Sequence, residues 1–387
     1  MNALVDISGI AVPSMKFLII AGFADDLLPF RGDLINALLE RGIQVHVALP
    51  DLEANSDLHD KLLKKGLVLH KVAMQRAGMN PLADLHTTWQ LLQLIKAIRP
   101  EAVFAYLIKP VIYGMIATSI AGVPHRFALI SGLGYAFQGE KNQRGLLRRL
   151  VQRLYAISLS GAHMIFFQNP DDLHLFHQLG ILKPNAPTCV VNGSGVNVDY
   201  YKYTPIPKGT PCFLMIARFL IDKGIREYAA AAKLVKAKYP EVRFTLVGWL
   251  DENPSAIAQQ ELDTWIAEGT IENIGRLADV RPAIAQCSVY VLPSYREGTP
   301  RSVLEAMSMG RAIITTDAPG CRETVCTEDN GLLVPVGSVN ELAKAMLRFI
   351  KNEEMILRMG QRSREIAEEK YDVHKVNQVM LNKMGIS

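Results

Sequence analysis

The sequence has few cysteines, and their spacing fits neither a disulfide-rich protein nor a cysteine-ligated zinc protein. There are 5 cysteines among 387 residues, and none stands in a C-x-x-C pair or beside histidines at metal-ligand spacing. The sequence therefore predicts neither a disulfide framework nor a cysteine-ligated zinc site. We expect reduced thiols, as in a cytoplasmic protein, with Cys321 and Cys326 as buried small side chains.

Strong net charge and long apolar runs are also lacking. The formal net charge is only +4, which is too small to suggest a nucleic-acid partner. The longest uncharged, nearly apolar run, residues 111–124, is shorter than the roughly 18–20 residues that span a bilayer, so no transmembrane helix is expected. Residues 1–14 lack the basic start and long apolar core of a secretory signal and are expected to form an N-terminal extension.

Apolar sequence is abundant enough for a large core. Hydrophobic residues make up 49% of the chain, which excludes disorder, and a length of 387 residues at about 150 per domain predicts two or three domains. Short apolar runs alternate with helix-period stretches over residues 15–205; the runs are KFLIIAG, IQVHVALP, VLHKVA, AVFAYLI, HRFALIS, HMIFFQN and TCVVNG. This alternation predicts an α/β domain with a parallel sheet and helices on both faces.

A second α/β series begins after a proline-rich stretch, YYKYTPIPKGTP, which is the predicted interdomain linker. The second domain is predicted at 206–365, and its first strand, FLMIAR, matches FLIIAG of the first domain in type. Ser338 and Glu341 form a predicted helix start, and a C-terminal helix at 366–387 is expected to pack back on the first domain. Ligands of open parallel sheets bind at the carboxyl ends of the strands, so the site is expected in a cleft between the domains.

The segment VYVLPSYREGTPRSVLEAMSMG joins a predicted strand to a predicted helix. Thr299 is expected to cap that helix and Pro300 to occupy its first position, so that the amides of Arg301 and Ser302 form an anion site. Glu297 and Glu305 flank this helix start. The alternative is a capped helix with solvated acids.

Two cations follow the first strand of the second domain, in IARFLIDKGIREY. Arg218 ends the strand and Lys223 lies in the loop before the next helix. Cations at this edge of a sheet, near a helix start, suit a diphosphate. Taken singly, either residue is equally well read as a solvated loop cation.

The set Arg218, Lys223 and Glu297-x7-Glu305, on two similar α/β halves, resembles glycosyltransferase family 4, the retaining enzymes of GT-B fold. Further segments resemble the bacterial branch that extends polyprenyl-diphosphate-linked sugars for capsule, O-antigen or protein glycans; these are NPLADL, LIKPVIYG, FALISGLGYAF, VVNGSGVN and PGCRETV. The resemblance covers residues 15 to about 380. It implies two Rossmann-like domains facing a central cleft.

The resemblance also implies roles for individual residues. Arg218 and Lys223 would hold the donor diphosphate, Glu297 the donor sugar and Glu305 the nucleotide ribose. Other donor contacts are expected from the helix start and from two further loops: Gly22, Gly275, Arg276, Thr299, Pro300, Arg301 and Ser302. The first-domain loop departs from the family's glycine-rich turn, because Gly22 is followed by Phe23, Ala24, Asp25 and Asp26.

Acceptor contacts are expected from the first domain. Lys109 stands where many relatives place a histidine, and the alternative is a solvated lysine. Gly132 and Gly134 lack the remaining features of a dinucleotide fingerprint and predict a sharp turn near the acceptor. The stretch KNQRGLLRRLVQRLY, with Arg148 and Arg149, predicts a basic amphipathic helix for an anionic membrane surface. The alternative is a helix whose apolar residues, Leu147, Leu150, Val151 and Leu154, face the core.

The combined expectation is a peripheral glycosyltransferase on the inner face of the cell membrane. It would transfer a sugar from a UDP-sugar to a polyprenyl-diphosphate-linked saccharide, with retention and without a cofactor or metal. Asp171, Asp172, His174 and His177 have the spacing of a metal cluster but fit a helix start better. The alternatives are a UDP-sugar 2-epimerase, which needs a general base that this motif set lacks, and a non-catalytic nucleotide-sugar-binding subunit.

Overall fold

The computed structural model describes residues 15–50, 56–75, 80–132, 145–251, 253 and 255–386. The predicted N-terminal extension 1–14 and Gly134 lie outside these residues. The chain divides into two compact units. Unit 1 comprises residues up to 166 together with 175–189 and 381–387, and unit 2 comprises 167–174 and 190–380.

Unit 1 is built on a sheet with the strand order β3-β2-β1-β4-β5-β6-β7. The neighbours β1–β2, β2–β3, β1–β4 and β4–β5 are parallel. The strands coincide with the predicted apolar runs because both faces of a parallel sheet are covered; they are β1 (Lys16–Ile20), β2 (Gln44–Leu49), β3 (Val68–Lys71), β4 (Ala102–Tyr106), β5 (His125–Ile130), β6 (Met164–Phe167) and β7 (Thr188–Val190).

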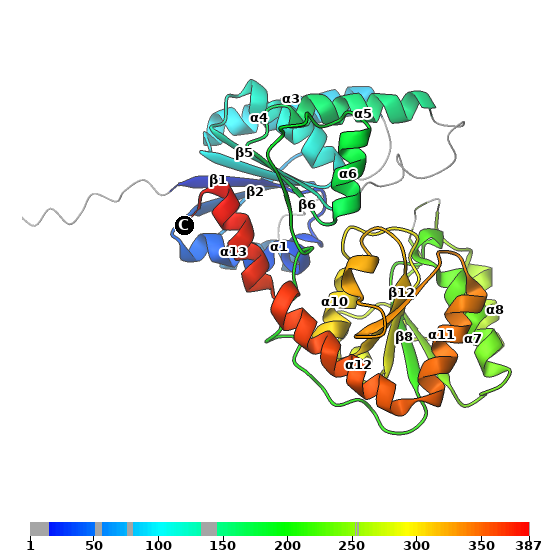
Figure 1. The fold of residues 1–387 in the computed structure, drawn as a ribbon. Coiled ribbons are helices and arrows are strands. Elements are labelled where there is room, and N and C mark those ends of the chain that lie inside the picture. The colour runs from blue at the N-terminus through cyan, green and yellow to red at the C-terminus, as the bar shows by residue number, and fades with distance from the viewer. Residues whose placement is uncertain are drawn as a thin grey trace, which may run out of the picture. The chain divides into compact units, whose positions relative to one another are not determined.

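Helices cover both faces of this sheet, as predicted (Figure 1). The helix α1 (Leu27–Glu40) lies on one face, and α3 (Pro81–Ile98), α4 (Met115–Ile120) and α5 (Gly145–Leu159) lie on the other. Further helices are α2 (Asp57–Lys64) and the π-helical turn η1 (Pro110–Gly114). The helix α6 (Pro170–Gln178) has residues 170–174 in unit 2 and 175–178 in unit 1. Asn80 begins α3: its side chain accepts hydrogen bonds from the amides of Leu82 and Ala83, with proline next in the chain.

Unit 2 repeats the plan with the strand order β10-β9-β8-β11-β12-β13. Every neighbouring pair is parallel, so all carboxyl ends meet at one edge. The strands are β8 (Cys212–Ile216), β9 (Arg243–Val247), β10 (Glu272–Asn273), β11 (Val289–Leu292), β12 (Ala312–Thr316) and β13 (Gly331–Val334).

Helices again flank the sheet of unit 2, with α10 and α12 on one face and α7, α8 and α11 on the other (Figure 1). Their bounds are α7 (Ile225–Lys236), α8 (Gln259–Ala267), α9 (Arg281–Ala285), α10 (Arg301–Ser308), α11 (Val339–Lys351), α12 (Glu353–Ile366) and α13 (Val373–Met384), with short turns at η3 (Ile221–Lys223), η4 (Arg322–Thr324) and η5 (Ala367–Tyr371). The predicted helix start at Ser338 is confirmed, since its side chain accepts from the amide of Glu341.

The chain joins unit 2 earlier than the proline-rich stretch indicates. Residues 190–205 group with unit 2, whereas the sequence places the boundary at 205/206. The reason is packing: Val196 and Tyr201 are buried in the core of unit 2, and the fully buried Arg311 donates to the carbonyl oxygen of Thr204 at 2.8 Å. At the other end, residues 381–387 group with unit 1.

All five cysteines are free thiols, as expected. Cys321 is buried, but Cys326 is exposed, so the prediction of two buried side chains is wrong for Cys326. It directly precedes the turn that leads into β13, where Asn330 accepts from its backbone amide at 2.8 Å. The hydrogen bond fixes the backbone of Cys326 and leaves the thiol in solvent.

Candidate active site

The predicted donor residues gather at the carboxyl edge of the unit 2 sheet. Arg218 and Lys223 follow β8, and Glu297 follows β11, which is the neighbour of β8. The amide of Tyr295 donates to the carbonyl oxygen of Asp222 at 2.8 Å and joins the two loops. A backbone hydrogen bond between the loops of adjacent strands therefore sets the position of Lys223 relative to Glu297.

Lys223 and Glu297 form an ion pair. The Lys223 Nζ lies 2.6 Å from Glu297 Oε1, and the two side chains are only 18% and 14% exposed. A largely buried charge requires a partner, and here each residue supplies the partner of the other. The alternative of a solvated acid is wrong for Glu297.

Arg218 forms a second pair on the same edge. Its guanidinium contacts the carboxylate of Asp251 at 3.0 Å and is 39% exposed. Asp251 comes from the loop after β9, the other neighbour of β8. The exposed part of the guanidinium provides donors for an anion, while Asp251 fixes its direction.

The helix α10 begins one residue later than expected. The Thr299 hydroxyl does not cap it but donates to the carbonyl oxygen of Gln168 at 2.8 Å, and Pro300 occupies the cap position. The prediction of a Thr299 cap is wrong because this carbonyl, 131 residues away, binds the hydroxyl instead. Ser302 lies in the first turn of α10, where its hydroxyl interacts with Tyr290.

Glu305 lies inside α10 and is not solvated. Its Oε1 accepts from Arg301 Nε at 2.8 Å and from the Tyr201 hydroxyl at 2.8 Å. Burial and the Glu305 carboxylate raise the pKa of the Tyr201 hydroxyl, so it remains a proton donor at neutral pH. Arg301 and Tyr201 therefore fix one oxygen of a carboxylate that the sequence assigned to ligand binding.

The predicted base loop lies at the far side of the same edge. Gly275, with φ of 74°, follows β10 in the left-handed region that favours glycine. The guanidinium carbon of Arg276 lies 4.4 Å from the ring centroid of Trp249, which follows β9. An aromatic face stacked on a guanidinium provides a flat surface of the kind that planar groups bind.

Comparisons with known proteins identify the family of the chain. The family model of the glycosyl transferases group 1 matches residues 210–352, and that of the glycosyl transferase 4-like domain matches residues 30–193. The N,N'-diacetylbacillosaminyl-diphospho-undecaprenol alpha-1,3-N-acetylgalactosaminyltransferase of Campylobacter jejuni is 30% identical over 352 residues, 87% of this chain and 90% of that protein. The chain belongs to the glycosyltransferase family that these two models and the C. jejuni enzyme represent.

Two further comparisons give a second curated relative and a solved structure that are similar to this glycosyltransferase. The UDP-Gal:alpha-D-GlcNAc-diphosphoundecaprenol alpha-1,3-galactosyltransferase of Escherichia coli is 24% identical over 68% of this chain and 70% of that protein. Among solved structures, HepE from Anabaena in complex with UDP superimposes with a TM-score of 0.75 at 20% identity, covering 96% of this chain and 99% of that one. The fold is GT-B, with two Rossmann-like units, as predicted.

The first unit of the glycosyltransferase pairs Lys109 with a buried acid. Its Nζ lies 2.7 Å from Asp84 Oδ1, and the Tyr113 hydroxyl donates to Asp84 Oδ2 at 2.7 Å. The interpretation of Lys109 as a solvated lysine is wrong, since the side chain is 16% exposed. Burial and the hydrogen bond to Asp84 raise the pKa of Tyr113.

Gly22 and Gly132 of the glycosyltransferase follow β1 and β5 in unit 1. A Cβ on Gly22 would come within 2.9 Å of the end of the Leu107 side chain, so a larger residue there requires that side chain to shift. Gly132, with φ of 143°, has a backbone conformation that favours glycine, as a sharp turn requires.

The helix α5 of the glycosyltransferase presents both cations and apolar side chains to solvent. Arg149 is exposed and Arg148 half-buried, while Leu150 and Ile157 are 54% and 62% exposed. The alternative of a core-facing helix is therefore wrong for Leu150, whereas Val151 and Leu154 are half-buried and Tyr155 and Leu159 are buried. The side chain of Leu147 lies outside the described residues.

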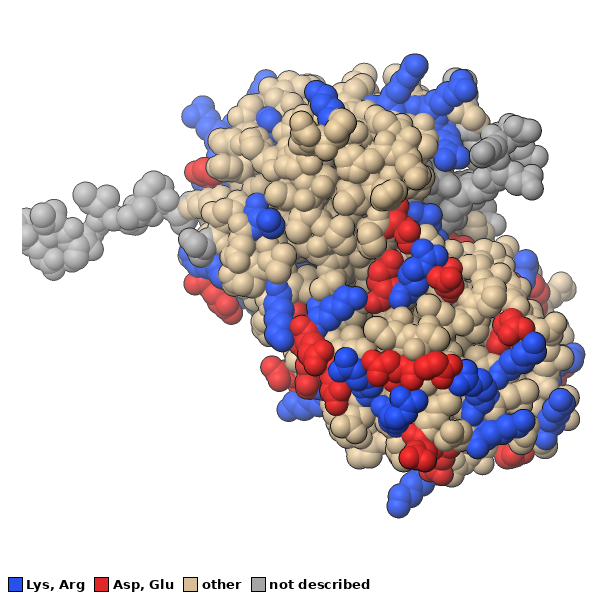
Figure 2. All heavy atoms as spheres, viewed as in Figure 1, with Lys and Arg blue, Asp and Glu red and all other residues tan. Residues whose placement is uncertain are grey.

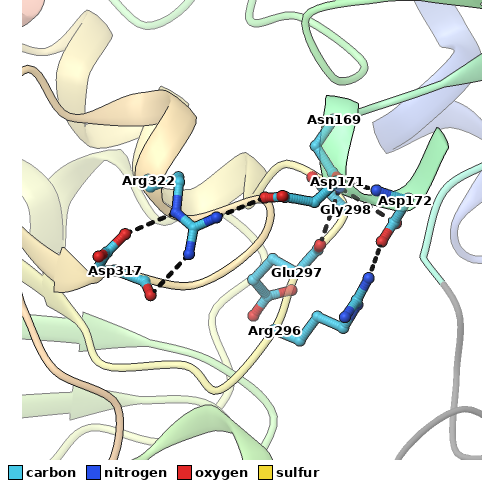
Figure 3. Close-up of polar contacts among 8 residues, drawn as sticks. All are labelled: Asn169, Asp171, Asp172, Arg296, Glu297, Gly298, Asp317 and Arg322. Carbon is cyan, nitrogen blue, oxygen red and sulfur yellow. Dashed lines mark hydrogen bonds and ion pairs between the residues drawn. The ribbon is translucent and has the colours of Figure 1, made fainter. Parts of the chain in front are cut away.

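Asp171 and Asp172 begin α6, as the sequence predicts, and each pairs with an arginine (Figure 3). Asp172 contacts Arg296, and Asp171 contacts Arg322 at 2.7 Å. Among the residues that the structure describes, no group of His, Cys, Asp and Glu side chains is arranged to hold a metal ion. The spacing of these acids reflects a helix start and two ion pairs.

Sequence reasoning missed several residues that hold the site. They are Asn169, Tyr201, Asp251 and Arg296, each of which contacts a predicted residue or its loop. Asp251 follows the strand beside β8, a position that the strand order reveals once it is known. The others carry no local sequence signal, because their partners lie about a hundred residues away in the chain.

Proposed function

We propose that this glycosyltransferase transfers a hexose or N-acetylhexosamine from a UDP-sugar to a polyprenyl-diphosphate-linked saccharide, with retention at the anomeric carbon. The observation that carries the proposal is the grouping of Arg218, Lys223 and Glu297 at the carboxyl edge of the unit 2 sheet. The acceptor class follows from the C. jejuni and E. coli relatives, whose names specify undecaprenyl-diphosphate-linked substrates.

The proposed reaction breaks the bond between the anomeric carbon and the diphosphate oxygen and forms one to an acceptor hydroxyl on the same face. The acceptor proton passes to the departing phosphate oxygen, so that atoms and charge balance without an enzymic nucleophile. Arg218 and Lys223 neutralise the charge that develops on the diphosphate. Removing one such preorganised donor lowers kcat by about 10²–10³, or about 3–4 kcal/mol.

Glu297 and Glu305 bind different parts of the donor in this proposal. Lys223 holds one Glu297 oxygen, and we assign the other to the hydroxyls of the sugar. Arg301 and Tyr201 hold one Glu305 oxygen, and we assign the other to the ribose. Trp249 and Arg276 then provide the surface for the base. No metal enters this scheme, because cationic side chains meet the diphosphate.

The proposed place of action is the inner face of the cell membrane, with unit 1 on an anionic bilayer. No described helix is long and apolar enough to cross a membrane. Figure 2 shows basic side chains gathered over the end of α5, with no acidic ones beside them. The helices α3 and α5 pack against the same two elements, α4 and η1, and α3 exposes Leu82, Leu85 and Trp89 by 78%, 68% and 56%. Apolar side chains beside arginines are the features of an interfacial surface.

Release of UDP from a panel of UDP-sugars, measured in EDTA with and without lipid-diphosphate saccharides, tests the reaction. Release with one donor only when the acceptor is present is the expected result, and the anomeric configuration of the product decides retention. Epimerised UDP-sugar without acceptor would instead indicate a 2-epimerase. UDP binding without release from any donor–acceptor pair would indicate a non-catalytic subunit, and release that EDTA abolishes would contradict metal independence.

Sedimentation with phosphatidylglycerol and phosphatidylcholine vesicles tests the membrane surface. We expect binding to the anionic vesicles only, lost in Arg149→Glu and weakened in Leu85→Ser. Leu357→Ser is the matched control, because Leu357 is 51% exposed on α12 of unit 2. Equal binding by the three variants would contradict the assignment of this surface.

A further inference from the structure

The segment 167–174 forms hydrogen bonds to the loop that carries Glu297. This segment groups with unit 2, although the chain before and after it belongs to unit 1. Asn169 is fully buried. Its Nδ2 donates to the carbonyl oxygens of Gly298 at 2.8 Å and Glu297 at 3.3 Å. Gln168 accepts from the Thr299 hydroxyl through its own carbonyl oxygen. Consecutive loop residues are therefore bonded to consecutive segment residues.

Asp172 fixes Asn169 and reaches the same loop through Arg296. The amide of Asp172 donates to Asn169 Oδ1 at 2.8 Å, and Asp172 Oδ2 accepts from Asn169 Nδ2 at 3.2 Å. Asp172 Oδ1 accepts from the guanidinium of Arg296, as Figure 3 shows. Burial raises the pKa of the Asp172 carboxyl against the opposing effect of Arg296. The fully buried Asp172 thus orients both the amide and the arginine.

The opposite side of the loop meets the turn at Pro319 and Gly320. The amide of Glu297 donates to the carbonyl oxygen of Pro319 at 2.9 Å. A Cβ on Gly320 would lie 2.2 Å from the carbonyl oxygen of Glu297 and 2.4 Å from that of Gly298. These are the same two carbonyl oxygens that Asn169 binds. The backbone at Glu297 is therefore enclosed between Asn169 and a glycine turn.

We propose that Asn169 and Asp172 are positioning residues, which fix the loop of Arg296–Gly298 so that the Glu297 carboxylate stays against Lys223 and the donor sugar. The inference deepens the proposed function and rests on it for the role of Glu297. Asn169 acts on the backbone and leaves the Glu297 side chain free to bind. A displacement of about 1 Å at such a site is enough to lower the rate about 10²-fold.

Hydrogen exchange of the loop amides at residues 295–299 tests the holding of the loop without any substrate. We expect Asn169→Ala and Asp172→Asn to speed this exchange at least about tenfold. Asp171→Asn is the matched control, because Asp171 occupies the same helical turn but pairs with Arg322 instead. Where Asn169→Ala does not fold, Asn169→Asp keeps the size of the side chain and loses its donor. Unchanged exchange in the folded variants would overturn the proposal.

A double-mutant cycle with Glu297→Gln tests the action through Glu297. We expect Asn169→Ala to lower kcat about 10–100-fold in the wild-type background, with the Kd of UDP changed less than about threefold. In the Glu297→Gln background the same change should lower kcat less than about threefold. Full additivity would overturn the positioning role. A wild-type protein without transfer would contradict the proposed function alone, since hydrogen exchange still decides whether the loop is held.

Discussion

Gly320→Ala provides a direct test of how tightly the Glu297 loop is enclosed. Gly320 has φ of 81°, a conformation that costs an alanine about 1–2 kcal/mol. The added Cβ also meets the carbonyl oxygens of Glu297 and Gly298 at 2.2 and 2.4 Å, whereas ordinary contact begins at 3.4 Å. The loop must therefore retreat by roughly 1 Å, which is the displacement expected to lower kcat about 10²-fold.

Gly42→Ala separates the two effects in this prediction. Gly42 has φ of 72°, and a Cβ there meets no atom within 4 Å, so only the backbone cost remains. We expect both variants to lose stability in thermal unfolding, and only Gly320→Ala to lose kcat in the UDP-release assay. A Gly320→Ala enzyme within threefold of wild-type kcat would refute the reasoning that the enclosure sets the position of Glu297.

The remaining predictions concern the two glutamates and a histidine pair. Glu297→Gln should lower kcat more than it weakens UDP binding, whereas Glu305→Gln should mainly weaken UDP binding by calorimetry; the reverse order would contradict the division of roles. In unit 1, the ring nitrogens of His46 and His70 lie 2.9 Å apart, and burial lowers the pKa of both. The unfolded chain then binds protons more readily than the folded one below about pH 6.5, so stability is full above that pH and is lost on acidification. His46→Gln should flatten the dependence of Tm on pH between 7 and 5, and an unchanged slope would exclude this pair as its cause.

The sheets were predictable because a parallel sheet covered on both faces leaves a local signal. Strands such as β1 and β11 contain a continuous apolar run, FLII and VYVL respectively, and the turns between runs carry glycine, proline and charge. The grouping of Arg218, Lys223 and Glu297 followed in the same way, because the carboxyl ends of neighbouring strands share one edge. Local sequence and topology predicted where these residues lie, and the family resemblance supplied the roles proposed for them.

Two of the interpretations that failed depend on partners distant in the sequence. Thr299 has the sequence of a helix cap, but the carbonyl oxygen of Gln168 binds its hydroxyl. Lys109 has the sequence of a loop cation, but Asp84 lies against it in the fold. A propensity describes a residue and its neighbours, whereas a buried polar group bonds to whichever partner the packing supplies. Such partners become visible only with the strand order.

The same reasoning explains why a residue that holds the site in place, such as Asn169, lies in a segment without a motif. Lys223 and Glu297 each hold the other, so their charges are set within the motif set itself. The backbone beneath Glu297 has no such partner nearby in sequence, and Asn169 supplies it from 128 residues away. A glutamate that is bound only through its carboxylate moves with its loop. One whose backbone carbonyl oxygen is also bound keeps the direction of its side chain. We therefore expect substitutions at Asn169 to affect turnover although no motif includes this residue.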